Sequence, residues 1–275
     1  MRAGTLCDYI SIVTKRWLTD GARVGVGLEG KVAMVTGGSR GIGAAIAVRL
    51  AAEGADIGYT QTKRPMGGEP TLNAIEGHGR RGLVVQADHA VPAQSAAAVE
   101  RIAAHFGRLD ILVNVAGIFV TGVIDDPERD ESAFDRQLAV NVGGVVSTTR
   151  AVVGFLSDGG RIVSIATAGA HATRTPTPGL GDYMASKSAV VAYSKGWARD
   201  LGSRGITVNV VQPGPIESDM VPAGSELAKS MGALTILGRI GTTADIAAAV
   251  AFLVGSEAGY ITGTSLTVDG GLQTL

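Results

Sequence analysis

The sequence predicts an α/β fold, a doubly wound three-layer α/β/α sandwich around a mainly parallel, seven-stranded sheet. Short apolar runs alternate with longer helical segments along most of the 275 residues. This alternation is typical of a parallel sheet that helices cover on both faces, because strands buried on both sides are apolar throughout. The first run, residues 32–35, leads through a glycine-rich turn directly into an alanine-rich helical segment.

The expected strands are apolar runs bounded by turn or polar residues. They lie at residues 32–35, 55–60, 83–87, 109–115, 161–166, 206–211 and 265–268. The helices expected between them lie at 44–53, 70–76, 92–106, 132–156, 182–201 and 244–254. Prolines and glycines between residues 61 and 70 confine the second helix to a short piece. Residues 217–241 form a variable segment, which we interpret as a candidate lid.

Neither an internal repeat nor a linker interrupts residues 30–275, and we interpret them as a single Rossmann-type domain. Residues 1–29 mix acids and bases without a long apolar segment, which argues against a secretory signal. We interpret these residues as a flexible N-terminal extension. An organelle transit peptide and an upstream start codon are the alternatives.

Composition restricts the partners that the protein is expected to have. The hydrophobic fraction of 45% is enough for a large core, and the net charge of −1 gives no basic field for nucleic acid or for a membrane surface. The sequence contains no apolar run near the ~20 residues of a membrane span. Cys7 is the only cysteine, which suits a reducing compartment. We therefore expect a cytoplasmic protein that acts on a small molecule.

The glycine-rich turn, residues 36–43, predicts a dinucleotide site. Glycine permits positive φ and lets a ligand approach the backbone closely. The first N–H groups of the following helix, with the positive end of the helix dipole, suit a pyrophosphate. The strand before the turn and the helix after it supply the required context. The candidate cofactor-binding residues here are Gly37, Ser39, Arg40, Gly41, Ile42 and Gly43.

Tyr183 and Lys187 form a candidate acid/base pair. They are four residues apart in a helical segment, which places both side chains on one helix face. A phenol with a pKa near ~10 is a poor base at neutral pH, and a nearby ammonium lowers that pKa. Such a pair can exchange a proton with a carbonyl or an alcohol oxygen. A surface tyrosine stacked on a lysine stem is the structural alternative.

Residues 31–271 resemble the short-chain dehydrogenase/reductase family, in its single-domain form. The matching motifs are the turn with Thr36, Gly37, Gly41 and Gly43, the segment Asn114-Val-Ala-Gly117, the Tyr183-x-x-x-Lys187 pair, Pro213-Gly214 and the stretch 261–271. The chain looks broadly like 3-oxoacyl-acyl-carrier-protein reductases and related carbonyl reductases. The resemblance adds to the expected cofactor site Asp88, His89, Asn114, Ala116, Gly117, Tyr183, Lys187, Pro213, Gly214, Ile216 and Ser218.

The resemblance also implies the catalytic roles. Tyr183 would exchange the proton with the substrate oxygen, and Lys187 would bind ribose hydroxyls and lower the tyrosine pKa. Thr167 would polarise the carbonyl, and Asn141 would order a water that relays protons from Lys187. A helix-interior amide that bends or caps the segment is the alternative for Asn141.

Three departures from the family pattern are visible. Thr167 stands where the family usually has a serine, and Ser164 competes with it for this role. Ser164 lies within the strand, where alternation would direct its side chain away from the site. Val115 replaces the second asparagine of the motif, and this change should loosen a local hydrogen-bond network. The weakened helix after the second strand puts the adenosine side of the site in doubt.

Charge at the end of the second strand favours NADP(H) over NAD(H). NAD sites place a carboxylate there, on the ribose 2′-hydroxyl, but this sequence has Gln61. Asp56 comes at the start of the strand and should point elsewhere. Arg40, Thr60, Gln61 and either Lys63 or Arg64 could receive a 2′-phosphate.

The leading hypothesis is thus a reductase of ketones, or a dehydrogenase of the matching secondary alcohols, that uses NADP(H). A cofactor- or nucleotide-sensing regulator with little turnover is the alternative, suggested by Thr167 and Val115. The four histidines lack metal-ligand spacing. Family resemblance predicts a homotetramer with contacts through residues 132–156 and 182–201.

Overall fold

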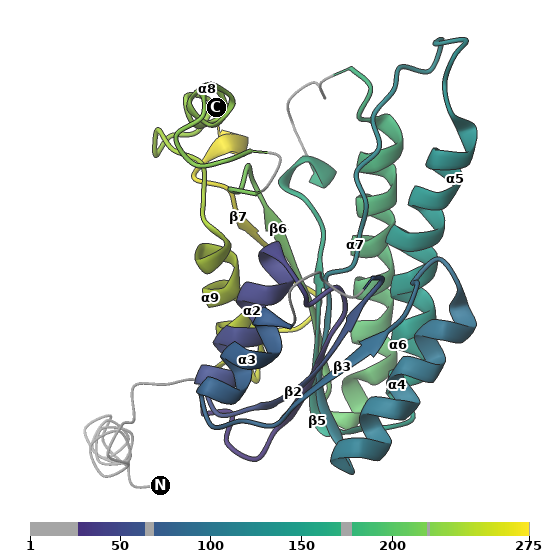
Figure 1. The fold of residues 1–275 in the computed structure, drawn as a ribbon, viewed down its shortest axis with the longest axis vertical. Coiled ribbons are helices and arrows are strands. Elements are labelled where there is room, and N and C mark those ends of the chain that lie inside the picture. Colours follow the sequence, from purple (N-terminus) through teal and green to yellow (C-terminus); the bar gives the residue numbers. More distant parts are fainter. Residues whose placement is uncertain (1–26, 64–68, 172–177, 219–220, 275) are drawn as a thin grey trace, which may run out of the picture.

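In the computed structural model, residues 27–63, 69–171, 178–218 and 221–274 are described, except for the side chains of residues 170, 171 and 274. Their centre is one seven-stranded sheet in the order β3-β2-β1-β4-β5-β6-β7, and every pair of neighbouring strands is parallel (Figure 1). The strands are β1 (Val32–Val35), β2 (Asp56–Gln61), β3 (Gly82–Gln86), β4 (Leu109–Asn114), β5 (Leu156–Ile165), β6 (Thr207–Pro213) and β7 (Ser265–Val268). The predicted doubly wound sheet is confirmed.

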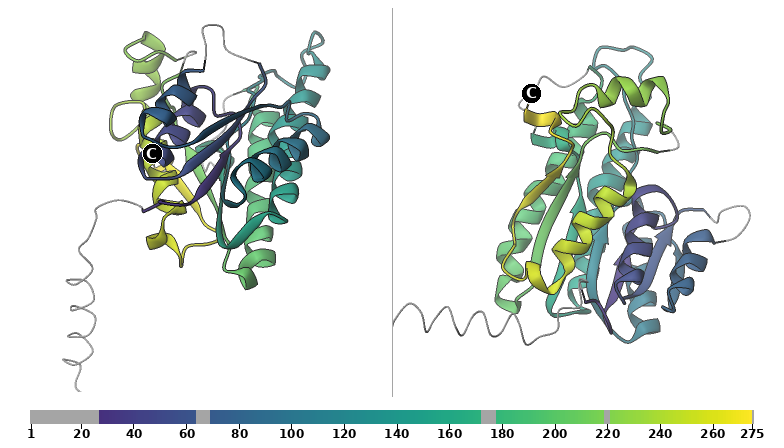
Figure 2. Two further views of the ribbon diagram at one scale, coloured as in Figure 1. Left: turned by 60° about the horizontal axis from the view of Figure 1, so that its bottom comes forward. Right: turned by 90° about the vertical axis from the view of Figure 1, so that its left-hand side faces the viewer.

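Helices cover both faces of the sheet (Figures 1 and 2). One face packs against α2 (Gly41–Ala52), α3 (Pro70–Gly77) and α9 (Thr243–Val254). The other face packs against α4 (Pro92–Phe106), α6 (Val145–Val153) and α7 (Gly181–Leu201), with α5 (Glu131–Leu138) beside α7. The segment expected as a lid contains α8 (Glu226–Gly232). Short helices occupy Ala168–His171, Gly202–Arg204, Ser256–Ala258 and Leu272–Thr274.

The strand order places a crevice next to β1. The chain builds outward from β1 through β2 to β3, then crosses back so that β4 lies on the other side of β1. In such sheets ligands bind outside the carboxyl ends of the strands at the point where the order reverses. All residues of β1 and β4 are buried, so the residues that follow these strands are held on a rigid support.

The helix expected at residues 132–156 is the main error in the predicted elements. The structure divides it into α5, a π-helical stretch at Ala139–Gly144 and α6, which ends at Val153. A side chain at Gly144 would lie 2.8 Å from His89 Cβ, so the backbone passes close to His89 at this point. Leu156 begins β5 and pairs with Leu109 of β4. The apolar residues near 155 satisfied a helical pattern, but pairing with β4 buries Leu156 in the core.

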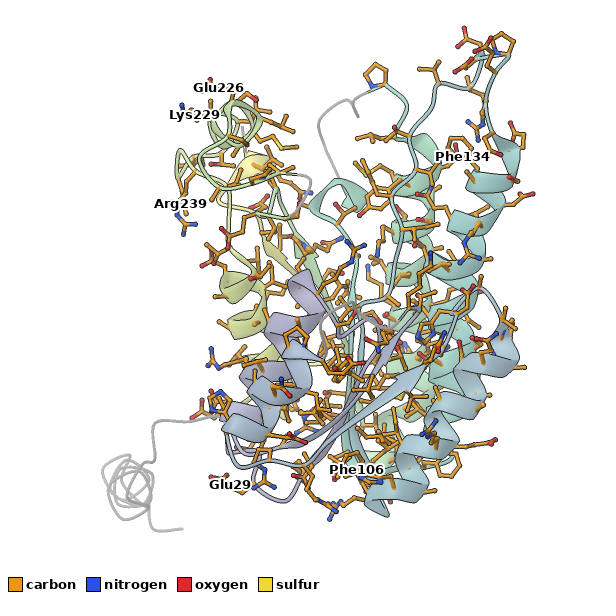
Figure 3. All side chains as sticks on the ribbon, in the orientation of Figure 1. Glu29, Phe106, Phe134, Glu226, Lys229 and Arg239 are labelled. Atoms are coloured by element: carbon orange, nitrogen blue, oxygen red, sulfur yellow. The ribbon has the colours of Figure 1, made fainter. Side chains whose placement is uncertain are left out.

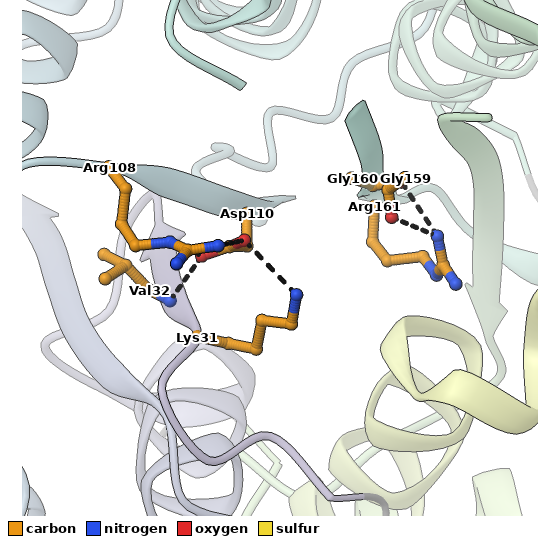
Figure 4. A network of polar contacts seen from close by, with 7 residues as sticks. All are labelled: Lys31, Val32, Arg108, Asp110, Gly159, Gly160 and Arg161. Atoms are coloured by element: carbon orange, nitrogen blue, oxygen red, sulfur yellow. Dashed lines mark hydrogen bonds and ion pairs between the residues drawn. The ribbon is translucent and has the colours of Figure 1, made fainter. Parts of the chain in front are cut away.

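The amino end of the sheet is held together by Asp110, which is only 3% exposed (Figure 4). Its carboxylate accepts the N–H of Val32 at 3.0 Å and binds Arg108 at 2.6 Å and Lys31 at 3.4 Å. An Asp110→Ala substitution should lower the free energy of unfolding by about 2 kcal/mol, because it leaves a buried N–H without an acceptor. Urea denaturation measures this change.

Asp158 provides the matched control for Asp110. Its ion pair with Arg204 has the same chemistry, but the Asp158 side chain is 77% exposed. Exposed ion pairs contribute little, so Asp158→Ala should change the free energy of unfolding by less than about 0.5 kcal/mol. Equal losses in the two variants would contradict the role assigned to Asp110.

In the described part of the chain, each helix is too short or too polar to cross a bilayer. The predicted extension at 1–29 lies almost entirely outside the described residues, which begin at residue 27. Its boundary with the domain therefore stays a prediction.

Candidate active site

The glycine-rich turn after β1 is held from below by two threonine side chains. The buried Thr36 hydroxyl accepts the N–H groups of Val115 and Ala116 at 2.9 and 3.0 Å, and so joins the ends of β1 and β4. The Thr60 hydroxyl accepts the N–H of Gly37 at 3.1 Å, and the Thr60 carbonyl accepts that of Gly38 at 3.0 Å. The turn is therefore fixed by its neighbouring strands.

The glycines of this turn are required for different reasons. Gly37 and Gly41 have φ of +67° and +54°, which other residues rarely adopt. A side chain on Gly38 would lie 2.6 Å from Tyr59, and one on Gly43 would collide with the carbonyl oxygen of Gly37. The first turn of α2 thus lies directly against the glycine-rich loop. A dinucleotide fits this cradle, because its pyrophosphate can approach bare backbone at a helix N-terminus.

A pocket of about 650 Å³ opens above this turn. Its lining contains many of the predicted cofactor residues: Gly37, Ser39, Arg40, Gly41, Ile42, Gly43, Gln61, Asp88, His89, Ala116, Gly117, Ile216 and Ser218. The other residues of that prediction lie outside this lining: Thr60, Asn114, Tyr183, Lys187, Pro213 and Gly214. The first group meets around one cavity although the sequence spreads it over the ends of β1, β2, β3 and β4 and the segment after β6.

Two residues outside the lining support the site from beneath. Thr60 is fully buried, with its hydroxyl engaged by Gly37 and His89, so its side chain lies under the turn and does not face a 2′-phosphate. Asn114 donates to Thr149 at 3.2 Å and to Ser164 at 3.3 Å. Ser164 is therefore engaged within the core between β4 and β5.

A carboxylate that the sequence reasoning missed, that of Glu69, contacts the pocket-lining residue Gln61. Gln61 donates to Glu69 at 2.9 Å, and the Tyr59 hydroxyl donates to the same carboxylate at 3.2 Å. Asp56 lies at the opposite end of β2, where it pairs with Arg80 and Arg81 at 2.9 and 2.7 Å. Of the expected cations, Arg40 lines the pocket and Arg64 lies outside the described residues.

Asp88 and His89 follow β3 and reach the pocket from its other side. Asp88 accepts the N–H of Ala90 and binds Arg136, both at 2.9 Å, and these contacts lower the pKa of its carboxyl. The His89 ring is buried, with Thr60 at 2.8 Å on one nitrogen and Ser95 at 2.9 Å on the other. His89 thus connects the glycine turn to the helices on the far face of the sheet.

The pH dependence of stability should reveal His89. Burial lowers its pKa to about 4 from the ordinary 6.5, because the charged ring is poorly solvated. The stability that depends on a neutral ring is complete above pH 6.5 and is lost as the pH falls towards 4, by on the order of 3 kcal/mol. Denaturant titrations at a series of pH values measure this loss.

A His89→Gln variant should flatten this part of the pH profile, whereas His78→Gln, at an exposed position, should leave it unchanged. A His89→Gln profile as steep as that of the unaltered protein would assign the acid sensitivity to other groups.

The candidate catalytic residues meet beside the pocket. Tyr183 comes from the first turn of α7, and Thr167, just after β5, lies beside its phenol. Burial raises the pKa of the Tyr183 phenol, and the neighbouring Thr167 side chain opposes this rise. Tyr183 is therefore protonated at neutral pH and can act as a donor. Thr167, and not Ser164, is the hydroxyl that the structure places against Tyr183.

Lys187 is buried, and its ammonium donates to the Ile165 carbonyl at 3.0 Å. Burial lowers its pKa to about 8. A Cβ placed on Gly117 would lie 3.3 Å from Lys187 Nζ and 3.2 Å from Asn141 Oδ1. Because Gly117 lines the dinucleotide pocket, Lys187 and Asn141 meet at its edge. The sequence-based expectation that Lys187 lowers the Tyr183 pKa finds no support in the contacts of the phenol, where Thr167 is the group that lowers it.

The amide of Asn141 lies within the π-helical stretch and is fully buried. Its oxygen accepts the N–H of Ile118 at 2.8 Å, and its nitrogen donates to the Ile118 carbonyl at 3.0 Å and to Ser186 at 3.1 Å. Both N–H groups are therefore engaged by protein. The side chain thus fixes the segment after β4.

The carboxyl end of β6 closes the site on the lid side. Gly214 donates to the Val268 carbonyl at 3.0 Å, and a side chain there would lie 2.7 Å from Asp269 Cα. Pro213 and Gly214 thus lie against β7 and direct the chain towards Ile216 and Ser218. The sequence reasoning did not place the other lining residues in the site: Thr62, Val115, Ile118, Arg136, Val140, Glu217, Ala223 and Thr243. Arg136 could have been found only from its contact with Asp88.

Among the described residues, no three side chains of potential metal ligands lie together. The site brings a phenol, a hydroxyl and an ammonium next to a cradle that fits a dinucleotide. The arrangement can hold a carbonyl oxygen between two hydroxyl donors, Tyr183 and Thr167.

Comparisons with known proteins agree with this geometry. A family model described as enoyl-(acyl carrier protein) reductase matches residues 37–273. The chain is similar to the 3-oxoacyl-acyl-carrier-protein reductase FabG of Escherichia coli, with 39% identity over 247 residues that cover 89% of this chain and 98% of the relative.

Solved structures give the same result. A short-chain dehydrogenase/reductase from Serratia marcescens is 45% identical with a TM-score of 0.86, and a short chain dehydrogenase from Burkholderia cenocepacia in complex with NADP is 47% identical with a TM-score of 0.85. In both cases the match covers 90% of this chain and 99% of the other.

Proposed function

Because the chain belongs to the short-chain dehydrogenase/reductase family, we propose that it transfers a hydride between NADP(H) and a ketone or secondary alcohol. The observation that carries the proposal is the position of Thr167 beside the Tyr183 phenol, next to a buried Lys187 at the edge of the pocket. The spacing of Tyr183 and Lys187 resembles that of the carbonyl reductases of the family.

The glycine turn and the start of α2 would hold the cofactor pyrophosphate, and Lys187 would bind its ribose from the edge at Gly117. When bound, the nicotinamide supplies the hydride to the carbonyl carbon, or accepts it from the alcohol. Thr167 orients the substrate oxygen, and Tyr183 donates its proton to that oxygen in the reductive direction. The raised pKa of the phenol favours this direction at neutral pH.

A panel of ketones and secondary alcohols, assayed with both NADPH and NADH, tests the proposal. We expect oxidation of NADPH by at least one class of ketone. The alternative, a cofactor-sensing regulator, predicts tight binding of NADPH in a fluorescence titration with no turnover of any substrate in the panel. The buried, hydrogen-bonded side chains of Asn141 and Lys187 near Tyr183 favour the enzyme.

The preference for NADP(H) is proposed from Arg40 and Gln61 in the pocket lining, but Glu69 acts against it. Its carboxylate contacts Gln61 and would repel a 2′-phosphate bound there. Glu69→Gln should therefore bind NADPH about fivefold more tightly, which corresponds to roughly 1 kcal/mol for a partly exposed charge pair. NADH binding should change little.

Fluorescence titrations with both cofactors measure this selectivity, and Arg40→Gln should shift it in the opposite direction. Tighter binding of NADH than of NADPH by the unaltered protein would show that Glu69 recognises a ribose hydroxyl and that the predicted preference is wrong. The proposals of a cytoplasmic location and a homotetramer rest on composition and family resemblance.

A further inference from the structure

The aromatic side chain of Phe119, which belongs to none of the sequence motifs described above, lies against the Tyr183 phenol. The ring of Phe119 is 4.8 Å from the Tyr183 ring, with an angle of 85° between the two planes. Such edge-to-face pairs are favourable. Phe119 nevertheless remains 50% exposed, so one part of the ring covers Tyr183 and the rest is available to another group.

Two buried amides hold the backbone on both sides of Phe119. Asn141 binds the N–H and the carbonyl of Ile118 at 2.8 and 3.0 Å, and Gln137 accepts the N–H of Val120 at 2.7 Å. Both amide side chains are fully buried. They come from adjacent turns at the junction of α5 and the π-helical stretch. Phe119 belongs to a loop, but its backbone is therefore fixed in place.

The same loop continues over a packed aromatic anchor. Phe134 on α5 is buried, and a side chain on Gly122 would lie 2.9 Å from its ring. Figure 3 shows Phe134 on one side of the open end of the sheet, with Glu226 and Lys229 of α8 on the other. The loop that carries Phe119 is thus supported at both ends.

We propose that Phe119 is a specificity-determining residue, which selects ketones with an aromatic ring next to the carbonyl. This inference rests on the proposed function of the Tyr183 site. A carbonyl oxygen between Tyr183 and Thr167 places its substituent near the exposed part of the Phe119 ring, where another aromatic ring can stack. The charged residues of the adjoining pocket lining are Arg40, Asp88, Arg136 and Glu217, and Asp88 and Arg136 pair with each other.

The packing of the protein gives Phe119 little reason to be aromatic. A half-exposed ring on a loop contributes less to stability than a buried one, and the loop is already fixed by Gln137, Asn141 and Phe134. Substitution at this position should therefore alter substrate choice more than folding.

The test compares acetophenone with butan-2-one as substrates, with NADPH as the cofactor. In Phe119→Ala, the ratio of kcat/KM for acetophenone to that for butan-2-one should fall about tenfold, mainly through KM, because the ring contact exists before and during the reaction. Phe155→Ala removes a ring of similar exposure, 45%, at the far end of α6, and should leave the ratio unchanged. Thermal melting and NADPH affinity establish that both variants are folded.

Gln137→Met tests the positioning of the ring without changing the ring itself. It removes the acceptor of the Val120 N–H, and the selectivity ratio should fall in the same direction as in Phe119→Ala. An unchanged ratio in Phe119→Ala would overturn the proposal. A ratio that falls in Phe119→Ala but not in Gln137→Met would show that Gln137 does not position the ring.

A measurement of ligand binding distinguishes a failure of the aromatic site from a failure of the proposed activity. Saturation-transfer NMR with acetophenone and NADP⁺ should detect contact with the unaltered protein and a much weaker signal with Phe119→Ala. Binding that depends on Phe119, without turnover of any ketone, would contradict the proposed function but retain the aromatic site. Turnover of ketones with the same binding signal and the same selectivity ratio in Phe119→Ala would support the proposed function but contradict the aromatic site.

Discussion

A Tyr183→Phe variant should lose turnover by about 10²- to 10⁴-fold, the contribution expected of a positioned acid/base group. The substitution removes one hydroxyl and preserves the ring, which should keep its edge-to-face contact with Phe119. The affinity for NADPH should stay nearly constant, because Tyr183 is absent from the lining of the dinucleotide pocket. Steady-state kinetics and a fluorescence titration measure the two quantities separately.

Tyr193 supplies the control within the same helix. It is 41% exposed and stacks on Trp197 at 5.3 Å, away from Thr167 and Lys187. Tyr193→Phe should therefore retain full activity. If Tyr183→Phe also remained fully active, the phenol would not be the proton donor and the proposed mechanism would be wrong.

A Gly43→Ala variant should weaken NADPH binding at least tenfold and lower stability by about 1–3 kcal/mol, the usual cost of overpacking. The added Cβ would collide with the Gly37 carbonyl oxygen and lie 2.9 Å from the Gly37 carbonyl carbon. Because both are backbone atoms, either the turn or the start of α2 must move. The cradle for the pyrophosphate would move with them.

Gly77→Ala provides the comparison for this effect. Gly77 lies in α3, and a Cβ at this position meets no atom within 4 Å. This substitution should be neutral or should stabilise the protein by up to about 1 kcal/mol, the difference in helix propensity between glycine and alanine. Near-normal NADPH affinity in Gly43→Ala would show that the close contact of α2 with the turn is not required for the site.

The order of the elements could be predicted because it depends on local sequence. Alternating apolar runs and helical segments predicted the parallel sheet, and the strands lie at or near their expected positions except β5, which begins at Leu156 instead of residue 161. The same local pattern wrongly predicted a single helix over residues 132–156. There the contact of Gly144 with His89 and the pairing of Leu156 with Leu109 decide where the helices end, and neither contact is visible in a helical pattern.

For the site, the sequence by itself identified the candidate residues that short spacing brings together. The turn at residues 36–43 and the four-residue step from Tyr183 to Lys187 are local, because a strand, a turn and a helix face are each defined by neighbouring residues. The tertiary structure alone decided which distant groups meet them: Thr60 and His89 below the turn, Glu69 on Gln61, and Phe119 on Tyr183. These contacts follow from how the strands and loops pack, which the spacing of residues along the chain does not specify.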